Sequence, residues 1–277
     1  MSLGEFELIG RYFSKHDRGE GVSLGIGDDC ALLSIPQGME LAVTTDTLNE
    51  GIHFFKGSDP YLLGYKTLAV NISDLAAMGA IPYACTLSVT LNEASPDFLE
   101  SFAQGFFDCA KNASIKNHIP LIGGNTTKGD LSFTVSAYGL CKTGQAMCRD
   151  KARVGDGIYV TGSLGLPALA VEIGYGKFEE LRADFNKLYK ISMMPVSRCD
   201  FACALADICR CAIDISDGLC GDLRHILLKS KVGAKLNLSS IPYPDYFKEH
   251  HLNADAALKL AISGGGDYEL LFTLPPS

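Results

Sequence analysis

Short segments rich in β-branched residues alternate with helical segments along the chain, and this alternation limits the possible folds more than any other feature of the sequence. Residues 40–46 (ELAVTTD) are typical of a strand. Asp59 as N-cap, Pro60 at the first helical position and Gly79 just past the end predict a helix between them. We expect further strands at 83–91, 131–141, 158–161, 211–215 and 268–274, further helices at 95–113 and 219–231, and a Gly-Gly turn after 120–124.

The length and the alternation together predict two consecutive α+β domains. A chain of 277 residues exceeds the usual size of one domain. A polar, glycine-bearing stretch at 145–157 is a suitable boundary, so we expect domains at 1–145 and 146–277. The sequence ends directly after an apolar, strand-like run, which predicts that the second domain is incomplete at its C-terminus.

The charge balance excludes some classes of partner. With 24 basic and 32 acidic residues the formal charge is -8, and no stripe of Lys and Arg stands out. We therefore expect no binding to nucleic acid or to an anionic membrane, although phosphate ligands remain compatible if divalent cations lie beside them. No run of about 18 apolar residues predicts a transmembrane helix, and the first residues lack the features of a secretory signal.

Ten cysteines raise the question of disulfides or a metal site. Cys199 and Cys203 are four residues apart and Cys209 and Cys211 are two apart, but neither pair has the C-x2-C spacing or nearby histidines of a zinc site. Buried structural thiols are the favoured interpretation, with a metal or redox site as the alternative. Reduced thiols predict a cytoplasmic protein.

Carboxylates stand beside glycines and at the expected ends of strands. Asp28 and Asp29 follow Gly25-Ile26-Gly27, Asp46 closes a predicted strand, and Asp214 and Asp217 precede Gly218. Taken singly, any one of these groups is better explained by a turn or a helix cap. Three such groups on one chain favour hard oxygen ligands for Mg²⁺ shared with phosphates.

Asp74 is the most informative single residue. It lies in the apolar helix KTLAVNISDLAAM with Thr67 and Asn71 at helical spacing on the same face. A solvated helix face is one explanation, but such faces are usually richer in Lys and Glu. A carboxylate among apolar residues is costly unless it is paired or bound to metal, so we favour a metal site.

The remaining motifs are weaker. Residues 123–127 (GGNTT) are expected in a loop after a strand and resemble an anion-binding loop, although the pattern is not a P-loop. Residues 264–267 (GGGD) are a second glycine-rich turn. No nucleophilic triad can be assigned, and a lone histidine such as His53 is usually structural.

Together these motifs resemble the thiamine-monophosphate kinase family, within the aminoimidazole ribonucleotide synthetase-like superfamily. The resemblance covers nearly the whole chain, through GIGDDCA (25–31), TTDT (44–47), HF (53–54), AVNISDLAAMGA (69–80), LIGGNTTKG (121–129), DISDGL (214–219) and SGGGDYELL (263–271).

The resemblance implies an N-terminal domain that dimerises by joining its sheet to that of the partner, and a second α+β domain behind it. ATP would bind in a cleft of the first domain, with several Mg²⁺ ions. The implied metal ligands are Asp29, Thr44, Thr45, Asp46, Asp74, Asn125, Asp214 and Asp217. The implied nucleotide contacts are Gly124, Asn125, Arg149 and Ser216, and the implied substrate contacts are His53 and Gly266.

The sequence departs from the family pattern at three places. Asn125 stands where the family usually has Asp, and Gly266 where it usually has Glu. A C-terminal portion carrying an aromatic substrate contact is missing from this sequence.

The implied reaction transfers the γ-phosphoryl of ATP to thiamine monophosphate. The acceptor oxygen is ionised at neutral pH, so the transfer needs positioning and charge neutralisation but no strong general base. Two alternatives remain open: another ATP-dependent synthetase of the superfamily, such as a selenophosphate synthetase or an amidine-forming ligase, and a catalytically weak protein that binds nucleotide or thiamine phosphate.

Overall fold

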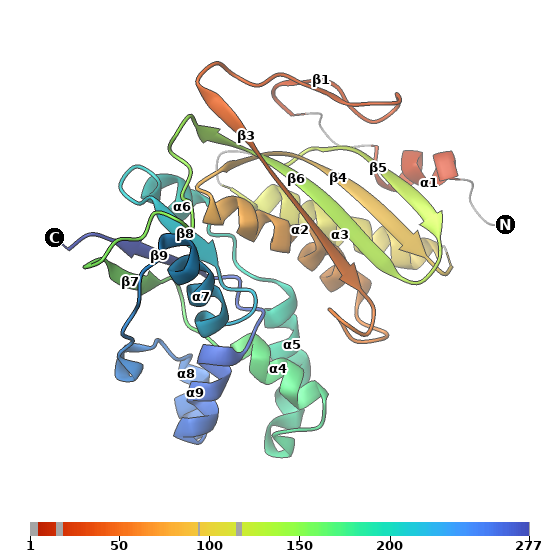
Figure 1. Ribbon diagram of the computed structural model, residues 1–277. Helices are drawn as coiled ribbons and strands as arrows, with labels where there is room; N and C mark the ends of the chain where they lie inside the picture. Colours follow the sequence, from red (N-terminus) through yellow and green to blue (C-terminus); the bar gives the residue numbers. More distant parts are fainter. Residues whose placement is uncertain (1–4, 15–18, 94, 115–117, 277) are drawn as a thin grey trace. The chain divides into compact units, whose positions relative to one another are not determined.

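The computed structural model describes residues 5–14, 19–93, 95–114 and 118–276 (Figure 1). The chain divides into two compact units, one formed by Met1–Leu75 and Ala80–Gly144 and the other by Ala76–Gly79 and Gln145–Ser277. Each unit combines helices with its own sheet, which confirms the α+β prediction. No helix in the described part of the chain is long and apolar enough to cross a bilayer.

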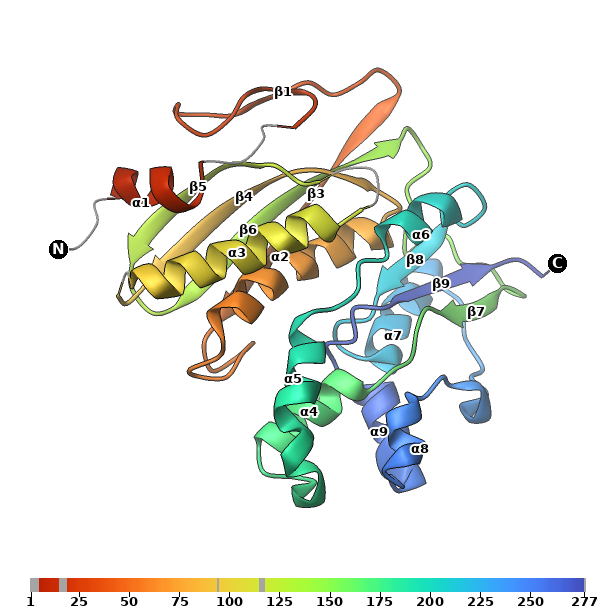
Figure 2. The same ribbon diagram turned by 180° about the vertical axis from the view of Figure 1, so that it is seen from behind.

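The N-terminal unit is built on a four-stranded sheet in the order β3-β6-β4-β5. β4 and β5 are parallel, and β6 is antiparallel to both of its neighbours. Helices α2 and α3 cover one face of this sheet, and the β1 hairpin lies over the other (Figures 1 and 2). The elements are α1 (Glu5–Tyr12), β1 (Val22–Leu24), β2 (Leu32–Leu33), β3 (Met39–Asn49), α2 (Pro60–Ala77), β4 (Ile81–Leu91), α3 (Pro96–Asn112), β5 (Leu121–Lys128) and β6 (Ser132–Lys142).

Helix α2 begins and ends where its sequence predicts. The Asp59 carboxylate accepts a hydrogen bond from the Tyr61 amide at 2.8 Å, and Gly79 follows the helix with a φ of +68°. The helix packs very closely on α3, because a Cβ at Gly64 would lie 2.0 Å from the Phe102 carbonyl oxygen. Glycine at this position therefore brings the two backbones into contact beneath the sheet.

The C-terminal unit contains a three-stranded antiparallel sheet in the order β7-β9-β8. One apolar cluster joins this sheet to α7, and a second lies among α4, α5, α8 and α9. The elements are β7 (Gly157–Val160), α4 (Leu166–Gly174), the 3-10 helix η1 (Glu179–Asp184), α5 (Phe185–Met193), α6 (Cys199–Leu205), β8 (Cys211–Asp214), α7 (Leu219–Ser230), η2 (Leu238–Ser240), α8 (Asp245–Glu249), α9 (Ala254–Ser263) and β9 (Leu270–Leu274).

Two local predictions were wrong. The predicted Gly-Gly turn at 123–124 and the loop after it are part of strand β5, which pairs with β4 through Lys128. A Cβ at Gly124 would lie 1.9 Å from the Leu87 carbonyl oxygen, so glycine here serves strand contact rather than a turn. Asp46 does not close its strand, because β3 continues through Asn49 in register with β6.

Candidate functional site

A pair of carboxylates lies between the sheet and helix α2 in the N-terminal unit. β3 carries Thr44 and Asp46 on the face toward α2, because alternate residues of a strand share a face. The Thr44 hydroxyl donates a hydrogen bond to Asp74 of α2 over 2.5 Å. Asp46 interacts with Asp74 electrostatically, so the structure brings these three predicted ligands together.

Without a bound cation, the ionisation of this carboxylate pair is unfavourable. Burial, and next the charge of Asp74, raise the pKa of Asp46 from 3.8 to about 6. Like charges held near one another disfavour ionisation, whereas a cation beside them would favour it. The Asp46–Asp74 pair is therefore a place where a divalent cation would relieve a cost that is already present.

The other polar residues of the stripe on α2 have a different role. Thr67 and Asn71 are buried, and each hydrogen-bonds to a backbone carbonyl one turn earlier in the helix. Asp74 is only partly buried. The stripe is therefore not a solvated helix face, and of its three members only Asp74 is placed to meet a ligand.

A cavity of about 830 Å³ lies on the face of the sheet opposite to α2 and α3. Asp29 lines it from the turn after β1, and Gly124 and Asn125 line it from β5. Its other walls are largely apolar side chains from α1, from the turn after it and from the sheet, such as Ile9, Phe13 and Ile122. Its volume lies within the range of small-molecule sites, so the structure joins predicted metal and nucleotide residues in one pocket.

Thr45 does not lie with Thr44 and Asp46. Its hydroxyl is 2.8 Å from the Ser136 hydroxyl on the open face of the sheet. The predicted ligands of the N-terminal unit therefore form two groups, one on each face of the sheet.

His53 follows β3 in an exposed turn. Its Nδ1 accepts a hydrogen bond from the Asn49 amide at 3.0 Å, which places the proton of the neutral ring on Nε2. The next residue, Phe54, is buried and packs near Phe133. This anchoring leaves Nε2 as a donor toward solvent or a ligand.

In the C-terminal unit, four predicted residues gather around the loop between β8 and α7. Asp214 is the buried last residue of β8, Ser216 is half-buried, and Asp217 is exposed. The Gly266 amide donates to the Ser216 carbonyl at 2.8 Å, which joins the glycine-rich turn to this loop. Arg149 is exposed, and its carbonyl accepts a hydrogen bond from the Ser230 hydroxyl at 2.8 Å.

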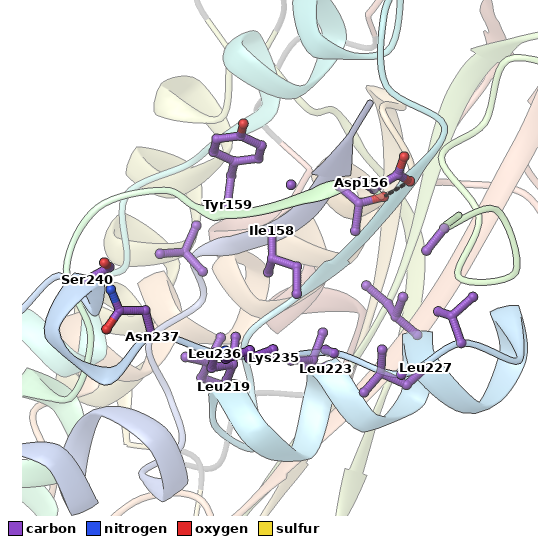
Figure 3. A pocket seen from close by; sticks show the side chains of 18 of the residues that line it. Asp156, Ile158, Tyr159, Leu219, Leu223, Leu227, Lys235, Leu236, Asn237 and Ser240 are labelled. Carbon is purple, nitrogen blue, oxygen red and sulfur yellow. Dashed lines mark hydrogen bonds between the residues drawn. The ribbon is translucent and has the colours of Figure 1, made fainter. Parts of the chain in front are cut away.

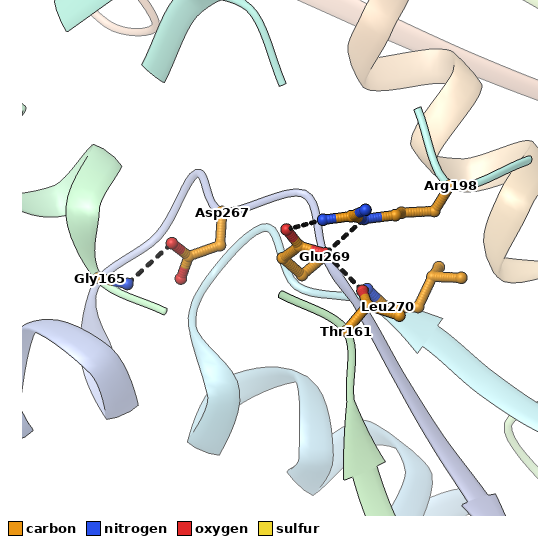
Figure 4. A network of polar contacts seen from close by, with 6 residues as sticks. All are labelled: Thr161, Gly165, Arg198, Asp267, Glu269 and Leu270. Atoms are coloured by element: carbon orange, nitrogen blue, oxygen red, sulfur yellow. Dashed lines mark hydrogen bonds and ion pairs between the residues drawn. The ribbon is translucent and has the colours of Figure 1, made fainter. Parts of the chain in front are cut away.

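Sequence reasoning missed the side chains that hold these loops. Arg198 forms two hydrogen bonds with Glu269, at 2.7 and 2.6 Å, and Thr161 donates to the same carboxylate (Figure 4). Asp267 accepts the Gly165 amide at the start of α4, at 2.9 Å. These contacts hold the residues that directly follow Gly266, and they join segments far apart in the sequence.

Asp267 is unusual among these groups. It is buried, and its Oδ2 has no hydrogen-bond partner among the described residues. Burial, the largest cause, together with the charge of Glu269, raises the pKa of this carboxyl from 3.8 to about 7, although the Gly165 amide acts in the opposite direction.

A further cavity of about 680 Å³ lies between β7 and α7 (Figure 3). Leu219, Leu223 and Ile158 form part of its apolar lining, and Asp156 and Asn237 are among its polar residues (Figure 3). None of the residues that line it is a predicted site residue. It is therefore separate from the candidate site.

The donor atoms fit Mg²⁺ bound together with phosphates. Among the described residues, no three His, Cys, Asp or Glu side chains form a cluster that could hold a metal ion without further ligands. Mg²⁺ is commonly held by one or two carboxylates with substrate phosphates and water. Asp46 and Asp74, with the neighbouring Thr44 hydroxyl, supply that type of donor set.

Comparison with known proteins gives matches along most of the chain. Residues 27–141 match the family described as AIR synthase related protein, N-terminal domain, and residues 153–267 match its C-terminal domain. The chain is 45% identical to the thiamine-monophosphate kinase of Escherichia coli (strain K12), over 99% of this chain and 84% of that protein.

Two solved structures are also similar. Thiamine-monophosphate kinase from Stenotrophomonas maltophilia K279a superposes with a TM-score of 0.83 at 43% identity, covering 92% of this chain and 81% of the other. The complex named AaThiL with AMPPCP and TMP superposes with a TM-score of 0.77 at 29% identity, covering 87% and 77%. With identity of this level over nearly its whole length, the chain belongs to the thiamine-monophosphate kinase family.

Proposed function

We propose that this protein transfers the γ-phosphoryl of ATP to thiamine monophosphate, giving thiamine diphosphate and ADP. The observation that carries the proposal is the Asp46–Asp74 pair, in a chain 45% identical to a thiamine-monophosphate kinase. A solved relative is named as a complex with an ATP analogue and TMP, which supports the same two ligands here.

The proposed Mg²⁺ ligands are oxygen atoms from several elements of the chain. Asp46, Asp74 and Thr44 would hold Mg²⁺ at the α2 face, and Asp29 and Asn125 would hold it in the cavity of the N-terminal unit. Asp214 and Asp217, and Thr45 on the open face, complete the set that we assign to several ions. When bound, Mg²⁺ would neutralise charge between the acceptor and the γ-phosphate.

We assign the nucleotide and acceptor contacts by the hydrogen-bond donors that each residue offers to phosphate. Gly124 lines the cavity with Asn125, while Ser216 and the exposed Arg149 offer a hydroxyl and a guanidinium to phosphate. His53 presents Nε2–H, which suits binding of an anionic acceptor rather than removal of its proton. The acceptor phosphate is ionised at neutral pH, so no general base is assigned.

We also propose a homodimer formed through the N-terminal unit, in the cytoplasm. β3 is an edge strand, and its open face exposes Leu41 (40%) and Val43 (59%). An unpaired edge with exposed apolar side chains favours pairing with a second copy. None of the ten cysteines, all of which lie in the described part of the chain, forms a disulfide, which is compatible with a reducing compartment.

The alternative is a protein that binds these ligands but turns over slowly. Two positions favour it: the neutral Asn125 among the metal ligands, and Gly266, which has a φ of +87° and no side chain to contact the substrate.

The test is ADP release with Mg²⁺ and ATP in three reactions: thiamine monophosphate, thiamine, and no acceptor. The proposal expects ADP release that depends on thiamine monophosphate and an equal amount of thiamine diphosphate. Binding of thiamine monophosphate and ATP without product would favour the alternative. ADP release that ignores the acceptor would contradict the kinase assignment.

A further inference from the structure

The loop between β8 and α7 is fixed by a carboxylate that no motif singled out. Asp222 lies in the first turn of α7 and is 3% exposed. One of its oxygens, Oδ2, accepts hydrogen bonds from two consecutive amides, Ser216 N at 3.1 Å and Asp217 N at 3.0 Å. Two successive amides that point at one oxygen form a small anion-binding concavity, and here the protein fills it with its own side chain.

The same loop is fixed from its other side by the glycine-rich turn. The Ser216 carbonyl accepts the Gly266 amide at 2.8 Å, and the Ile215 carbonyl accepts the Tyr268 amide at 2.8 Å. A Cβ at Gly265 would lie 2.5 Å from the Ser216 carbonyl oxygen, so the two backbones are in direct contact.

These contacts decide what Ser216 and Asp217 can offer a ligand. The amide and carbonyl of Ser216 both have protein partners, and the amide of Asp217 is also occupied. Backbone donors of these two residues are therefore not available to a phosphate. What remains for a ligand is the Ser216 hydroxyl and the exposed Asp217 carboxylate.

We propose that Asp222 is a positioning residue, which holds the backbone at Ser216 and Asp217 so that the Asp217 carboxylate meets the metal–nucleotide complex. This inference rests on the proposed function, which assigns Asp217 to metal and Ser216 to nucleotide. Asp222 does not bind the metal itself, because it is buried and its Oδ2 is engaged by the two amides.

Substitutions can distinguish two roles of Asp222: accepting the two hydrogen bonds and supplying a negative charge. Both amides donate to one oxygen, so the amide oxygen of Asp222→Asn can replace it and keep both hydrogen bonds. Asp222→Ala removes both. Asp255→Asn, at an exposed residue in the first turn of α9, is the control for loss of one negative charge near a helix start.

The first measurement is Mn²⁺ binding by electron paramagnetic resonance, with AMPPCP saturating. Asp222→Ala loses both hydrogen bonds, but the Gly266 and Tyr268 amides still hold the loop. We therefore expect the Mn²⁺ dissociation constant to rise about tenfold, which is the net effect of about one hydrogen bond. Asp222→Asn and Asp255→Asn should stay within about threefold of the wild type. Wild-type binding by Asp222→Ala would overturn the proposal, and so would an equal loss in Asp222→Asn.

The second measurement does not use metal or turnover. Hydrogen exchange at the Ser216 and Asp217 amides should be faster in Asp222→Ala and near wild type in Asp222→Asn; unchanged exchange in Asp222→Ala would overturn the proposal. If Asp222→Ala does not fold, Asp222→Glu takes its place, because glutamate keeps the charge but moves the carboxylate oxygen. Wild-type Mn²⁺ binding by Asp222→Glu would then count against the positioning role. A wild-type protein that binds Mn²⁺ and AMPPCP but does not phosphorylate thiamine monophosphate would refute only the proposed reaction.

Discussion

Replacement of Asp74 by Asn should separate stability from activity. The Thr44 hydroxyl can donate to the amide oxygen as it does to the carboxylate, so the hydrogen bond between β3 and α2 survives. The variant loses one of two neighbouring negative charges. Without divalent metal it should therefore be slightly more stable than the wild type, while with Mg²⁺ it should have lost turnover.

The magnitude follows from the pKa of Asp46. The rise from 3.8 to about 6 corresponds to roughly 3 kcal/mol at about 1.36 kcal/mol per pKa unit. Burial is the larger cause and the charge of Asp74 the smaller, so less than half belongs to the pair. Asp46 is also partly exposed, and solvent screening reduces the repulsion further. We expect Asp74→Asn to gain about 0.5–1 kcal/mol in free energy of unfolding.

The sign depends on pH. Because the folded pKa of Asp46 is raised, its ionisation costs stability as the pH rises from about 4 to about 6, and the full cost is present above that window. The gain of Asp74→Asn should appear at pH 7.5 and shrink toward pH 4.5. Urea unfolding in EDTA at both values measures it.

The matched control is Asp59→Asn, at the N-terminus of the same helix. It removes one charge from α2 while keeping an efficient N-cap, since Asn and Asp cap equally well. This control should keep turnover and the stabilisation produced by Mg²⁺, and Asp74→Asn should lose most of both. An Asp74→Asn protein that is less stable in EDTA by 1 kcal/mol or more, or that retains wild-type turnover, would refute the reasoning.

Three further predictions concern metal affinity, assembly and pH. Asn125→Asp should lower the Mg²⁺ concentration for half-maximal ADP release at saturating ATP, because a carboxylate holds a dication more tightly than an amide; an unchanged titration would mean that Asn125 is not a ligand. Light scattering of the wild type should give twice the 29.7 kDa chain mass. Val43→Lys places a charge on the exposed β3 edge, so the measured mass of this variant should fall to that of one chain. A monomeric wild type would count against the dimer. Asp267→Asn keeps the Gly165 hydrogen bond but removes a carboxylate whose raised pKa costs stability as the pH rises from about 4 to about 7. The unfolding free energy of the variant should therefore vary less over that window than that of the wild type. An equal pH dependence in the two proteins would contradict this.

Local signals predicted most of the elements. The cap at Asp59 and the glycine at Gly79 predicted the ends of α2 to within a residue or two. Runs with β-branched residues located β3, β4 and β6, and an apolar run located β9. These signals are carried by neighbours in sequence, so they can be recognised without the fold.

Pairing between distant segments could not be predicted in the same way. Gly123 and Gly124 have the composition of a turn, but β4 offers a parallel partner that extends them into β5. Alternate residues of a strand point to opposite faces, so the sequence alone could have predicted that Thr45 lies apart from Thr44 and Asp46. Only the fold shows what each face of β3 meets, which is Asp74 on one side and Ser136 on the other.

The candidate site shows why a cost argument identifies a residue but not its role. A carboxylate on the apolar side of a helix needs compensation, and both Asp74 in α2 and Asp222 in α7 meet that description. Asp222 is compensated by two backbone amides of the preceding loop, so its charge is used inside the protein. Asp74 instead receives the Thr44 hydroxyl and faces a second carboxylate, Asp46, which increases the local negative charge. A carboxylate that accepts amides fixes a loop, whereas a carboxylate opposed by another favours a cation, and only the tertiary partners distinguish the two.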